Sequence, residues 1–384
     1  LSSLFGILSL FSIFFLSFQI NKSLKEAIFC LILISLNIYL IKYSQELRPY
    51  TYILFLCLLN IIFFFKIIEK NLLIKNKIIY SFFFILFSLL SMSSHPFVLL
   101  IFFTQIIYLL YNFYFHKDKS ILFFILLPII CFLYLYFNYD FIMQNIKGED
   151  ETNLWITSLS NKFYYDYFFS RFFGSKIMGT IYLITLIYLI IKLKNKIFSK
   201  SSKLSFFVFL IIISYLVPIT YGVVFRPLLT DRYIIFVLIG IFCLISSLAL
   251  TLKSKKIKYS ILFLLIFSTL INLFIEIKFR VNAKPEFVKT INYIKSEKIN
   301  SVAIIAGDTT TFDLIKNYLK DINNTLKYFE LKNKFENKNK FFILCYEPLV
   351  GYNCNFKKYE KNKYNVLELR NFYLIKLAKV EIIN

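Results

Sequence analysis

The sequence predicts an all-α polytopic transmembrane bundle of about ten spans, followed by a small C-terminal α/β extracytoplasmic domain. Three observations support this fold class. The 384 residues are 58% hydrophobic and 20% aromatic, with a mean hydropathy of +0.67. Continuous apolar runs of about 17–20 residues recur, which suits membrane-spanning helices and exceeds the length of barrel strands. After residue 276 the sequence changes to amphipathic and strand-like segments.

Ten apolar runs within residues 1–276 are candidate spans. They cover residues 1–20, 27–44, 50–67, 77–94, 97–115, 120–138, 177–192, 204–222, 233–252 and 258–276, with approximate ends. The loops between them form two alternating sets. Five loops, beginning with the one that holds Lys22 and Lys25, carry seventeen lysines, whereas the other loops carry seven cations. Because Lys and Arg are enriched in cytoplasmic loops, the lysine-rich set is expected in the cytoplasm.

This charge distribution bears on partners and orientation. The net charge of +23 is explained by topology, so no nucleic-acid partner is expected. The outer face then receives residue 1, the loop 139–176 with its interfacial helices, and the domain 277–384. Because no anchor or initiator Met precedes Leu1, an earlier span and outer loop are expected upstream of it; processing of a longer precursor is the alternative.

Polar side chains gather in the predicted outer turns. Glu46 and Arg48 stand in YSQELRPY (Tyr43–Tyr50) between two apolar runs, His95 separates two spans, and RPLLTDRY (226–233) precedes another. Ionisable residues next to spans are functional candidates. The predicted lining of an outward-facing cavity is Glu46, Arg48, His95, Arg232 and Tyr233. Arginines there suit a phosphate or pyrophosphate, and the carboxylate suits a divalent metal ion or the proton of a hydroxyl.

Each candidate also has a simpler structural interpretation. In this interpretation, Glu46 and Arg48 form an ion pair that ends two spans, and Pro49 is an ordinary helix-start residue. His95 is an interfacial residue satisfied by headgroups or water, and Arg232 with Tyr233 anchors the chain at the membrane interface. The aromatic run 163–173 is interpreted as an amphipathic helix lying on the membrane.

The C-terminal segment predicts alternating helices and strands. Helices are expected at 283–299 and 310–320, and strands at 301–308, 340–346 and 371–379. A disulfide between Cys345 and Cys354 is plausible outside the cytoplasm. The other four cysteines lie in apolar runs, and no Cys/His spacing predicts a zinc site.

The order of these features resembles the dolichyl-phosphate-mannose protein mannosyltransferase and aminoarabinose transferase group of the GT-C superfamily. The pattern Y-[AS]-x-E-x-R-P-Y of that group is matched by Tyr43, Ser44, Glu46, Arg48, Pro49 and Tyr50. Ser94, His95 and Phe97 loosely match a later outer turn, although Thr is usual at the first position. Arg232–Tyr233 matches a later span start, and Ser3 and Gly6 match the segment that opens the second span. The resemblance covers roughly residues 1–252.

The resemblance implies an inverting glycosyltransferase in a membrane, expected to be the bacterial inner membrane. Such enzymes move a sugar from a polyprenyl-phosphate donor to a lipid, glycan or protein acceptor outside the cytoplasm. An acid in the first outer loop deprotonates the acceptor, so the catalytic residue is expected upstream of Leu1 and not at Glu46. Arg48, His95 or Arg232 is expected near the donor phosphate. No cofactor is certain, and a divalent metal ion is possible.

Two rival functions stay open at this point. An O-antigen ligase or polymerase carries a large outer loop with paired arginines near the end of its chain, whereas the long loop here is central. A transporter or flippase usually has Gly- or Pro-broken helices and mid-membrane charges. Here the spans are expected to be unbroken apart from Pro128 and Pro218, which favours an enzyme.

Overall fold

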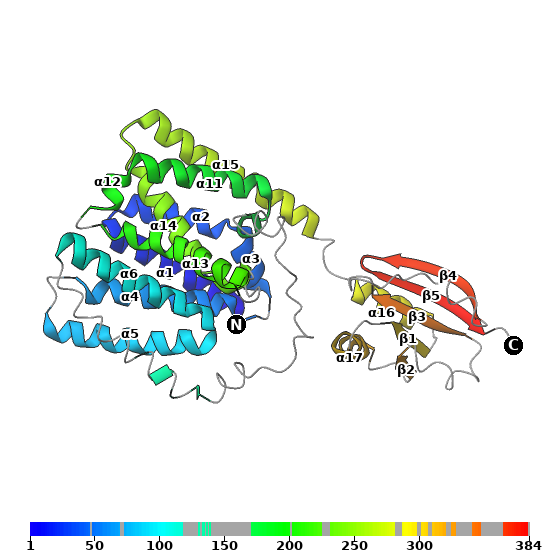
Figure 1. Ribbon diagram of the computed structural model, residues 1–384. Coiled ribbons are helices and arrows are strands. Elements are labelled where there is room, and N and C mark those ends of the chain that lie inside the picture. Colours follow the sequence, from blue (N-terminus) through cyan, green and yellow to red (C-terminus); the bar gives the residue numbers. More distant parts are fainter. Residues whose placement is uncertain are drawn as a thin grey trace. The chain divides into compact units, whose positions relative to one another are not determined.

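The computed structural model in Figure 1 describes most of the chain. The described residues are 1–46, 48–69, 73–117, 130, 133–134, 136, 138–139, 170–199, 202–224, 231–280, 286–297, 301–305, 309–319, 324–327, 340–346 and 364–382. They belong to two compact units, Leu1–Glu276 and Ile277–Asn384. The first unit is helical, and the second contains a β-sheet with two helices.

The first unit is a bundle of long apolar helices. Its helices are α1 (Ser2–Asn21), α2 (Leu24–Ser35), α3 (Ile38–Gln45), α4 (Tyr50–Ile67), α5 (Ile74–Ser94), α6 (Leu99–His116), α10 (Arg171–Phe173), α11 (Lys176–Lys192), α12 (Lys194–Ile197), α13 (Leu204–Val224), α14 (Val237–Leu250) and α15 (Lys255–Arg280), with the short 3-10 helices η1 (Pro96–Val98) and η5 (Asp231–Ile234). Among the described residues, six helices are long and apolar enough to cross a membrane, and α2 with α3 makes a seventh if a bent pair counts as one span. The predicted run 120–138 lies largely outside the described residues.

Helix α14 forms the centre of this bundle. Every residue from Val237 to Ala249 is buried, and the helix packs against α1, α2, α11 and α13, as Figure 1 shows. By contrast, only 17% of an apolar 18-residue stretch of α15, and 22% of such a stretch of α5, is buried within the protein. A helix that exposes this much apolar surface suits contact with lipid. The predicted polytopic bundle is therefore confirmed.

The second predicted span is broken, which corrects the expectation of a continuous helix over 27–44. Helix α2 ends at Ser35, α3 begins at Ile38, and the two axes differ by 60°. The Asn37 side chain accepts a hydrogen bond from the backbone N–H of Leu40 at 3.0 Å. An asparagine side chain that caps a new helix start replaces the backbone bonds of a continuing helix.

Buried amides join three of the long helices. Asn60 in α4 donates from Nδ2 to Ser88 Oγ in α5 at 2.7 Å, and Gln105 in α6 donates from Nε2 to Asn60 Oδ1 at 2.6 Å. These three side chains are fully buried among apolar residues. Hydrogen bonds between helices in such surroundings contribute roughly 0.6–2 kcal/mol each. They hold α4, α5 and α6 side by side.

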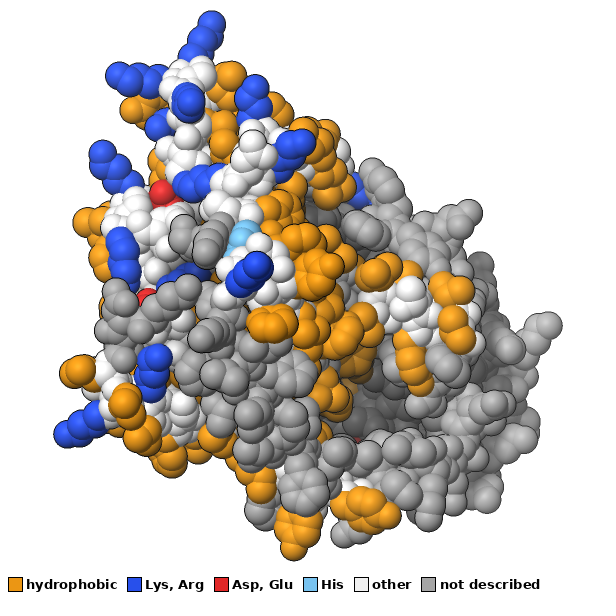
Figure 2. Space-filling model, turned by 60° about the vertical axis from the view of Figure 1, so that its left-hand side comes forward, with side chains coloured by type: hydrophobic (Ala, Val, Ile, Leu, Met, Phe, Trp, Pro, Cys, Tyr) orange, Lys and Arg blue, Asp and Glu red, His pale blue; other side chains and the backbone are white. Residues whose placement is uncertain are grey.

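The two ends of the bundle differ in charge. The C-terminal ends of α1, α6 and α11 and the N-terminal ends of α5 and α15 carry lysines. Figure 2, which turns this end forward, shows Lys and Arg side chains gathered there with few Asp or Glu between them. Among them Lys203 is largely buried and donates to Glu69 Oε1 at 3.2 Å. We call this the lysine end and the opposite end the site end.

The second unit is a five-stranded mixed sheet. Its strands are β1 (Ser301–Ile305), β2 (Asn324–Lys327), β3 (Lys340–Tyr346), β4 (Tyr364–Phe372) and β5 (Ile375–Ile382), and its helices are α16 (Phe287–Ser296) and α17 (Thr309–Tyr318). The strand order is β2-β1-β3-β5-β4, with β1 parallel to β2 and β3 and the other pairs antiparallel. The predicted strand 371–379 is wrong in one respect: it crosses the β4–β5 turn, where Leu374 has φ 59°.

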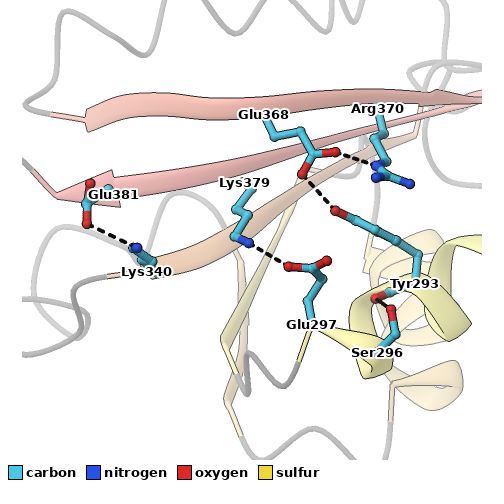
Figure 3. A network of polar contacts seen from close by, with 8 residues as sticks. All are labelled: Tyr293, Ser296, Glu297, Lys340, Glu368, Arg370, Lys379 and Glu381. Carbon is cyan, nitrogen blue, oxygen red and sulfur yellow. Dashed lines mark hydrogen bonds and ion pairs between the residues drawn. The ribbon is translucent and has the colours of Figure 1, made fainter.

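Charged side chains join α16 to the sheet of this unit (Figure 3). Tyr293 donates its hydroxyl to Glu368 Oε2 at 2.8 Å, and the Arg370 guanidinium lies 3.9 Å from the centre of the Tyr293 ring. Lys379 in β5 donates to Glu297 at 2.6 Å. Burial and the Glu368 carboxylate raise the pKa of Tyr293 to about 12. The hydroxyl therefore stays protonated and donates at neutral pH.

Candidate functional site

The YSQELRPY segment forms a tight turn at the site end between α3 and α4. Helix α3 ends at Gln45, and Glu46 has extended backbone angles. The Arg48 N–H donates to the Glu46 carbonyl at 2.8 Å, and Pro49 precedes the first turn of α4. Arg48 Nε lies 3.5 Å from Glu46 Oε2, with side chains 49% and 31% exposed. Such an exposed pair contributes only about 0–1 kcal/mol, so the guanidinium is available to an incoming anion.

Helix α1 supports this turn from one side. Ser3 Oγ donates to the Ser44 carbonyl at 2.8 Å, and Thr51 Oγ1 donates to the Ser2 carbonyl at 3.0 Å. A side chain at Gly6 would overlap the Ser44 hydroxyl, so the close approach requires glycine. Ser3 and Gly6 are the residues that the family resemblance singled out at the start of the chain. The structure gives both a packing role beside Ser44.

A concavity opens next to Arg48. It has a volume of about 540 Å³ and is lined almost entirely by apolar atoms. Its lining residues are Leu1, Ser2, Phe5, Arg48, Pro49, Thr51 and Tyr52. An apolar concavity with one guanidinium at its edge suits an amphiphile that carries a negative charge.

His95 occupies the turn between α5 and η1 at the same end. Its Nδ1 accepts a hydrogen bond from the Phe97 N–H at 3.2 Å. The imidazole centre lies 4.6 Å from that of Tyr233, and the Phe97 ring lies 5.2 Å from Tyr233. Because Nδ1 is an acceptor, the proton of the neutral ring is on Nε2.

Burial and the positive charge of Arg232 lower the pKa of His95 from 6.5 to about 4. Desolvation is the larger cause, because the charged form loses water in this turn. The ring is therefore neutral between pH 5 and 8 and acts as a hydrogen-bond donor through Nε2. It is not poised as a general acid or base at neutral pH.

Arg232 connects the His95 turn to YSQELRPY. Its guanidinium carbon lies 5.8 Å from the Tyr233 ring centre and 6.0 Å from that of Tyr50. Cation–π contacts of this kind contribute about 0.5–1 kcal/mol at exposed sites and more when desolvated. Arg232 thus links η5, to which it belongs, to the start of α4, where Tyr50 is the first helical residue after the Glu46–Arg48 turn.

Edge-to-face aromatic contacts extend the group across the site end. Tyr50 contacts Tyr43 at 5.0 Å between ring centres, Tyr43 contacts Tyr39 at 4.6 Å, and Tyr39 contacts Phe172 at 5.0 Å. We call Phe172, Tyr39, Tyr43, Tyr50, Tyr233 and Phe97, together with His95 and Arg232, the aromatic chain. It joins YSQELRPY, the His95 turn, η5 and the end of the loop 139–176, which the sequence placed at the outer face.

The structure thus places His95 against Tyr233, brings Arg232 near both, and places Glu46 and Arg48 in the turn before Tyr50. The interpretation of 163–173 as a helix on the membrane is wrong for Phe172 and Phe173, which are 0% and 3% exposed inside the bundle; residues 163–169 lie outside the described part. Sequence reasoning missed Tyr39 as a site residue, although its spacing of four from Tyr43 places both on one face of α3.

Metal ligands and disulfides have a simple outcome. In the described residues, no group of three or more His, Cys, Asp or Glu side chains is placed to hold a metal ion. Cys345 in β3 is disulfide-bonded. Cys354 lies outside the described residues, so its pairing with Cys345 stays a prediction. Cys30, Cys57 and Cys243 are free thiols buried in the bundle.

Comparison with known proteins gives one informative similarity. No sequence-family description and no curated protein sequence matches the chain. The structure is similar to the crystal structure of ArnT from Cupriavidus metallidurans in the apo state. The TM-score is 0.57 at 9% sequence identity, over 98% of this chain and 82% of ArnT. The two proteins share a fold. The predicted resemblance to the aminoarabinose transferase group is therefore confirmed at the level of fold.

Proposed function

We propose that this protein is a membrane glycosyltransferase of the GT-C type. It moves a sugar from a polyprenyl-phosphate donor to a lipid, glycan or protein acceptor on the outer face of the membrane in which it lies. The transfer inverts the configuration at the anomeric carbon. The observation that carries this proposal is the fold shared with ArnT over 98% of the chain. The site residues support it, because those matched to the family's motifs lie together at one end of the bundle.

Two arginines are assigned to the donor phosphate. The Arg48 guanidinium is half-exposed beside the apolar concavity, which suits a phosphate whose prenyl chain lies against apolar side chains. Arg232 supplies a second positive charge within 6.0 Å of the Tyr50 ring centre. Guanidinium groups bind phosphate through paired N–H donors, and they stabilise the charge that develops as the phosphate leaves the sugar.

His95 and Glu46 are assigned orienting roles. Neutral His95 donates from Nε2 to a phosphate oxygen or a sugar hydroxyl, since its Nδ1 is held by the Phe97 N–H. Glu46 orients Arg48 through their ion pair. From the family resemblance, the acid that deprotonates the acceptor belongs to an outer loop and is not Glu46. The divalent metal ion considered from the sequence stays a prediction, because no group of three His, Cys, Asp or Glu side chains in the described residues is placed to hold one.

One observation favours a second function, a flippase of lipid-linked glycans. Helix α2–α3 is broken by 60° in a candidate span, and broken helices are common in transporters. In transporters, however, the break lines a polar cavity that binds substrate or ions. Here Asn37 is 2% exposed and its amide donates to the Phe172 carbonyl at 2.8 Å. The break is filled by an aromatic segment of the same chain, which supports the enzyme.

Replacement of Arg48 tests the proposed function. In the full-length protein, Arg48→Ala is expected to lower sugar transfer by about 10- to 160-fold, the equivalent of about 1.5–3 kcal/mol for a hydrogen bond to a charged group. Membrane insertion is expected to be unchanged. Arg370→Ala is a matched control, because Arg370 is also 49% exposed and also pairs with a glutamate through Nε. If Arg48→Ala transfers sugar at the wild-type rate, Arg48 is not part of the donor site.

A further inference from the structure

The segment Ser170–Ser175, which we call the loop end, enters the bundle as the short helix α10, and its helical path ends at Gly174. Phe172 is fully buried against Tyr39, and Phe173 stacks on Tyr182 in α11 with ring centres 4.1 Å apart. Backbone carbonyls that enter an apolar bundle lose their water and need other donors. The partners of the loop-end carbonyls are therefore informative.

Two buried asparagines supply those donors. Asn37 Nδ2 donates to the Phe172 carbonyl and Asn272 Nδ2 donates to the Phe173 carbonyl, each at 2.8 Å. The other end of each amide is also used. Asn37 Oδ1 accepts from the Leu40 N–H at 3.0 Å, and Asn272 Oδ1 accepts from Ser175 Oγ at 2.9 Å. Consecutive carbonyls are thus held by one amide from the cap of α3 and one from α15.

The backbone at Gly174 touches the start of α3. Its φ of 79° is left-handed, and an added Cβ would lie 2.7 Å from Ile38 Cγ2. Only glycine allows both the conformation and the contact without strain. The loop end therefore contacts the first residue of α3 directly, in addition to the hydrogen bond through Asn37.

Helix α3 needs such contacts to be held in place. It has only eight residues, and a helix this short is not stable by itself. Its axis departs from α2 by 60°, so α2 does not direct it. The loop end holds its first turn, whereas the Ser3–Ser44 hydrogen bond holds its last. Glu46 follows directly, so the direction of α3 sets the position of Glu46 and Arg48.

We propose that Asn37 and Asn272 are positioning residues that clamp the loop end between the start of α3 and α15, and so place Arg48 for the donor phosphate. The effect on transfer rests on the proposed function, whereas the clamp itself does not. Asn37→Ser isolates the clamp, because serine retains the capping acceptor for the Leu40 N–H but its side chain is too short to reach the Phe172 carbonyl. Asn272→Leu removes the second donor.

Asn60→Ser is the matched control. It removes a buried amide of the same size, which bonds Ser88 and Gln105, far along the chain from the loop end. In the full-length protein in detergent, backbone hydrogen–deuterium exchange is measured over 38–45 and 170–175, and the KM for a polyprenyl-phosphate sugar is measured beside it. Asn37→Ser is expected to speed exchange in both segments and to raise KM, each by about five-fold or more. Asn60→Ser is expected to change neither.

Unchanged exchange in residues 38–45 of Asn37→Ser overturns the clamp. Faster exchange with a KM equal to that of Asn60→Ser overturns the positioning role and leaves the amides as ordinary stabilising groups. Absence of sugar transfer by the wild-type protein contradicts the proposed function instead, and the exchange measurement still decides the clamp in that case. Asn272→Leu is expected to reproduce the effect of Asn37→Ser in both measurements.

Discussion

Replacing Arg232 with glutamine is expected to raise the pKa of His95 without restoring its ordinary value. Burial and Arg232 together lower that pKa from 6.5 to about 4, and burial is the larger cause. Removal of the guanidinium therefore leaves a pKa between 4 and 6.5. At pH 6 a histidine with a pKa of 4 is about 1% protonated, whereas one with a pKa of 6.5 is about 76% protonated.

The rate at which the imidazole C2 hydrogen exchanges with deuterium depends on protonation of the ring. Following this rate across pH by mass spectrometry of the histidine-containing peptides gives the pKa of each histidine. The chain has two histidines, so His116 in α6 serves as an internal reference. The wild-type His95 midpoint is expected near pH 4 and that of Arg232→Gln at higher pH. A midpoint near 6.5 in the wild-type protein would show that His95 is not enclosed by Tyr233 and Arg232, and would refute the geometry of the aromatic chain.

The lowered pKa of His95 also predicts how the stability of the folded protein changes at acid pH. Because the folded-state pKa lies below the unfolded value, the unfolded chain binds a proton first as the pH falls. His95 therefore costs no stability above about pH 6.5 and progressively destabilises the folded protein between 6.5 and about 4. His95→Gln is expected to lessen the loss of thermal stability in this pH window. An unaltered pH dependence in that variant contradicts the account.

Three further predictions follow from single contacts. Gly174→Ala is expected to destabilise the first unit by at least about 1–2 kcal/mol from the left-handed backbone, and an unchanged unfolding temperature would show that the loop end is not built as described. Cys345 and Cys354 are expected to resist thiol labelling until a reductant is added; ready labelling of both without reductant argues against their disulfide. Tyr293→Phe, which deletes the hydroxyl bonded to Glu368, is expected to lower the free energy of unfolding of the second unit by about 0.5–1.5 kcal/mol. It is also expected to speed hydrogen–deuterium exchange in residues 364–372, and unchanged exchange would show that this bond does not stabilise the unit.

Much of the fold follows from the sequence because apolar runs bounded by lysine, proline or serine have few alternatives. The predicted span 50–67 coincides with α4, whose start is set by Pro49 and whose last turn contains Lys66. The break at Asn37 was missed because isolated polar residues such as Ser35 and Asn37 in the run LISLNIYLI are compatible with a continuous helix. The hydrogen bond that favours the break joins the Asn37 amide to the carbonyl of Phe172, which is 135 residues away in the sequence.

The sequence predicted members of a candidate site but not how they are arranged. Charge counting and motif order identified Glu46, Arg48, His95 and Arg232, because ionisable groups at span ends stand out in an apolar chain. The run FFSRFF reads alike for a membrane-surface helix and for a buried anchor. The buried carbonyls of Phe172 and Phe173 accept hydrogen bonds from Asn37 and Asn272, which neither spacing nor composition connects to this run. The turn at Leu374 was missed because it has no Gly, Asn or Asp to mark it.

The most direct test of the proposed function compares sugar transfer with lipid movement in the same proteoliposomes. The full-length protein is reconstituted with a labelled polyprenyl-phosphate sugar and an acceptor lipid, and both the labelled product and the leaflet of the donor are followed over time. The account predicts labelled product that depends on Arg48, while the donor stays in its original leaflet. Movement of the donor between leaflets without labelled product would contradict it and would establish a flippase.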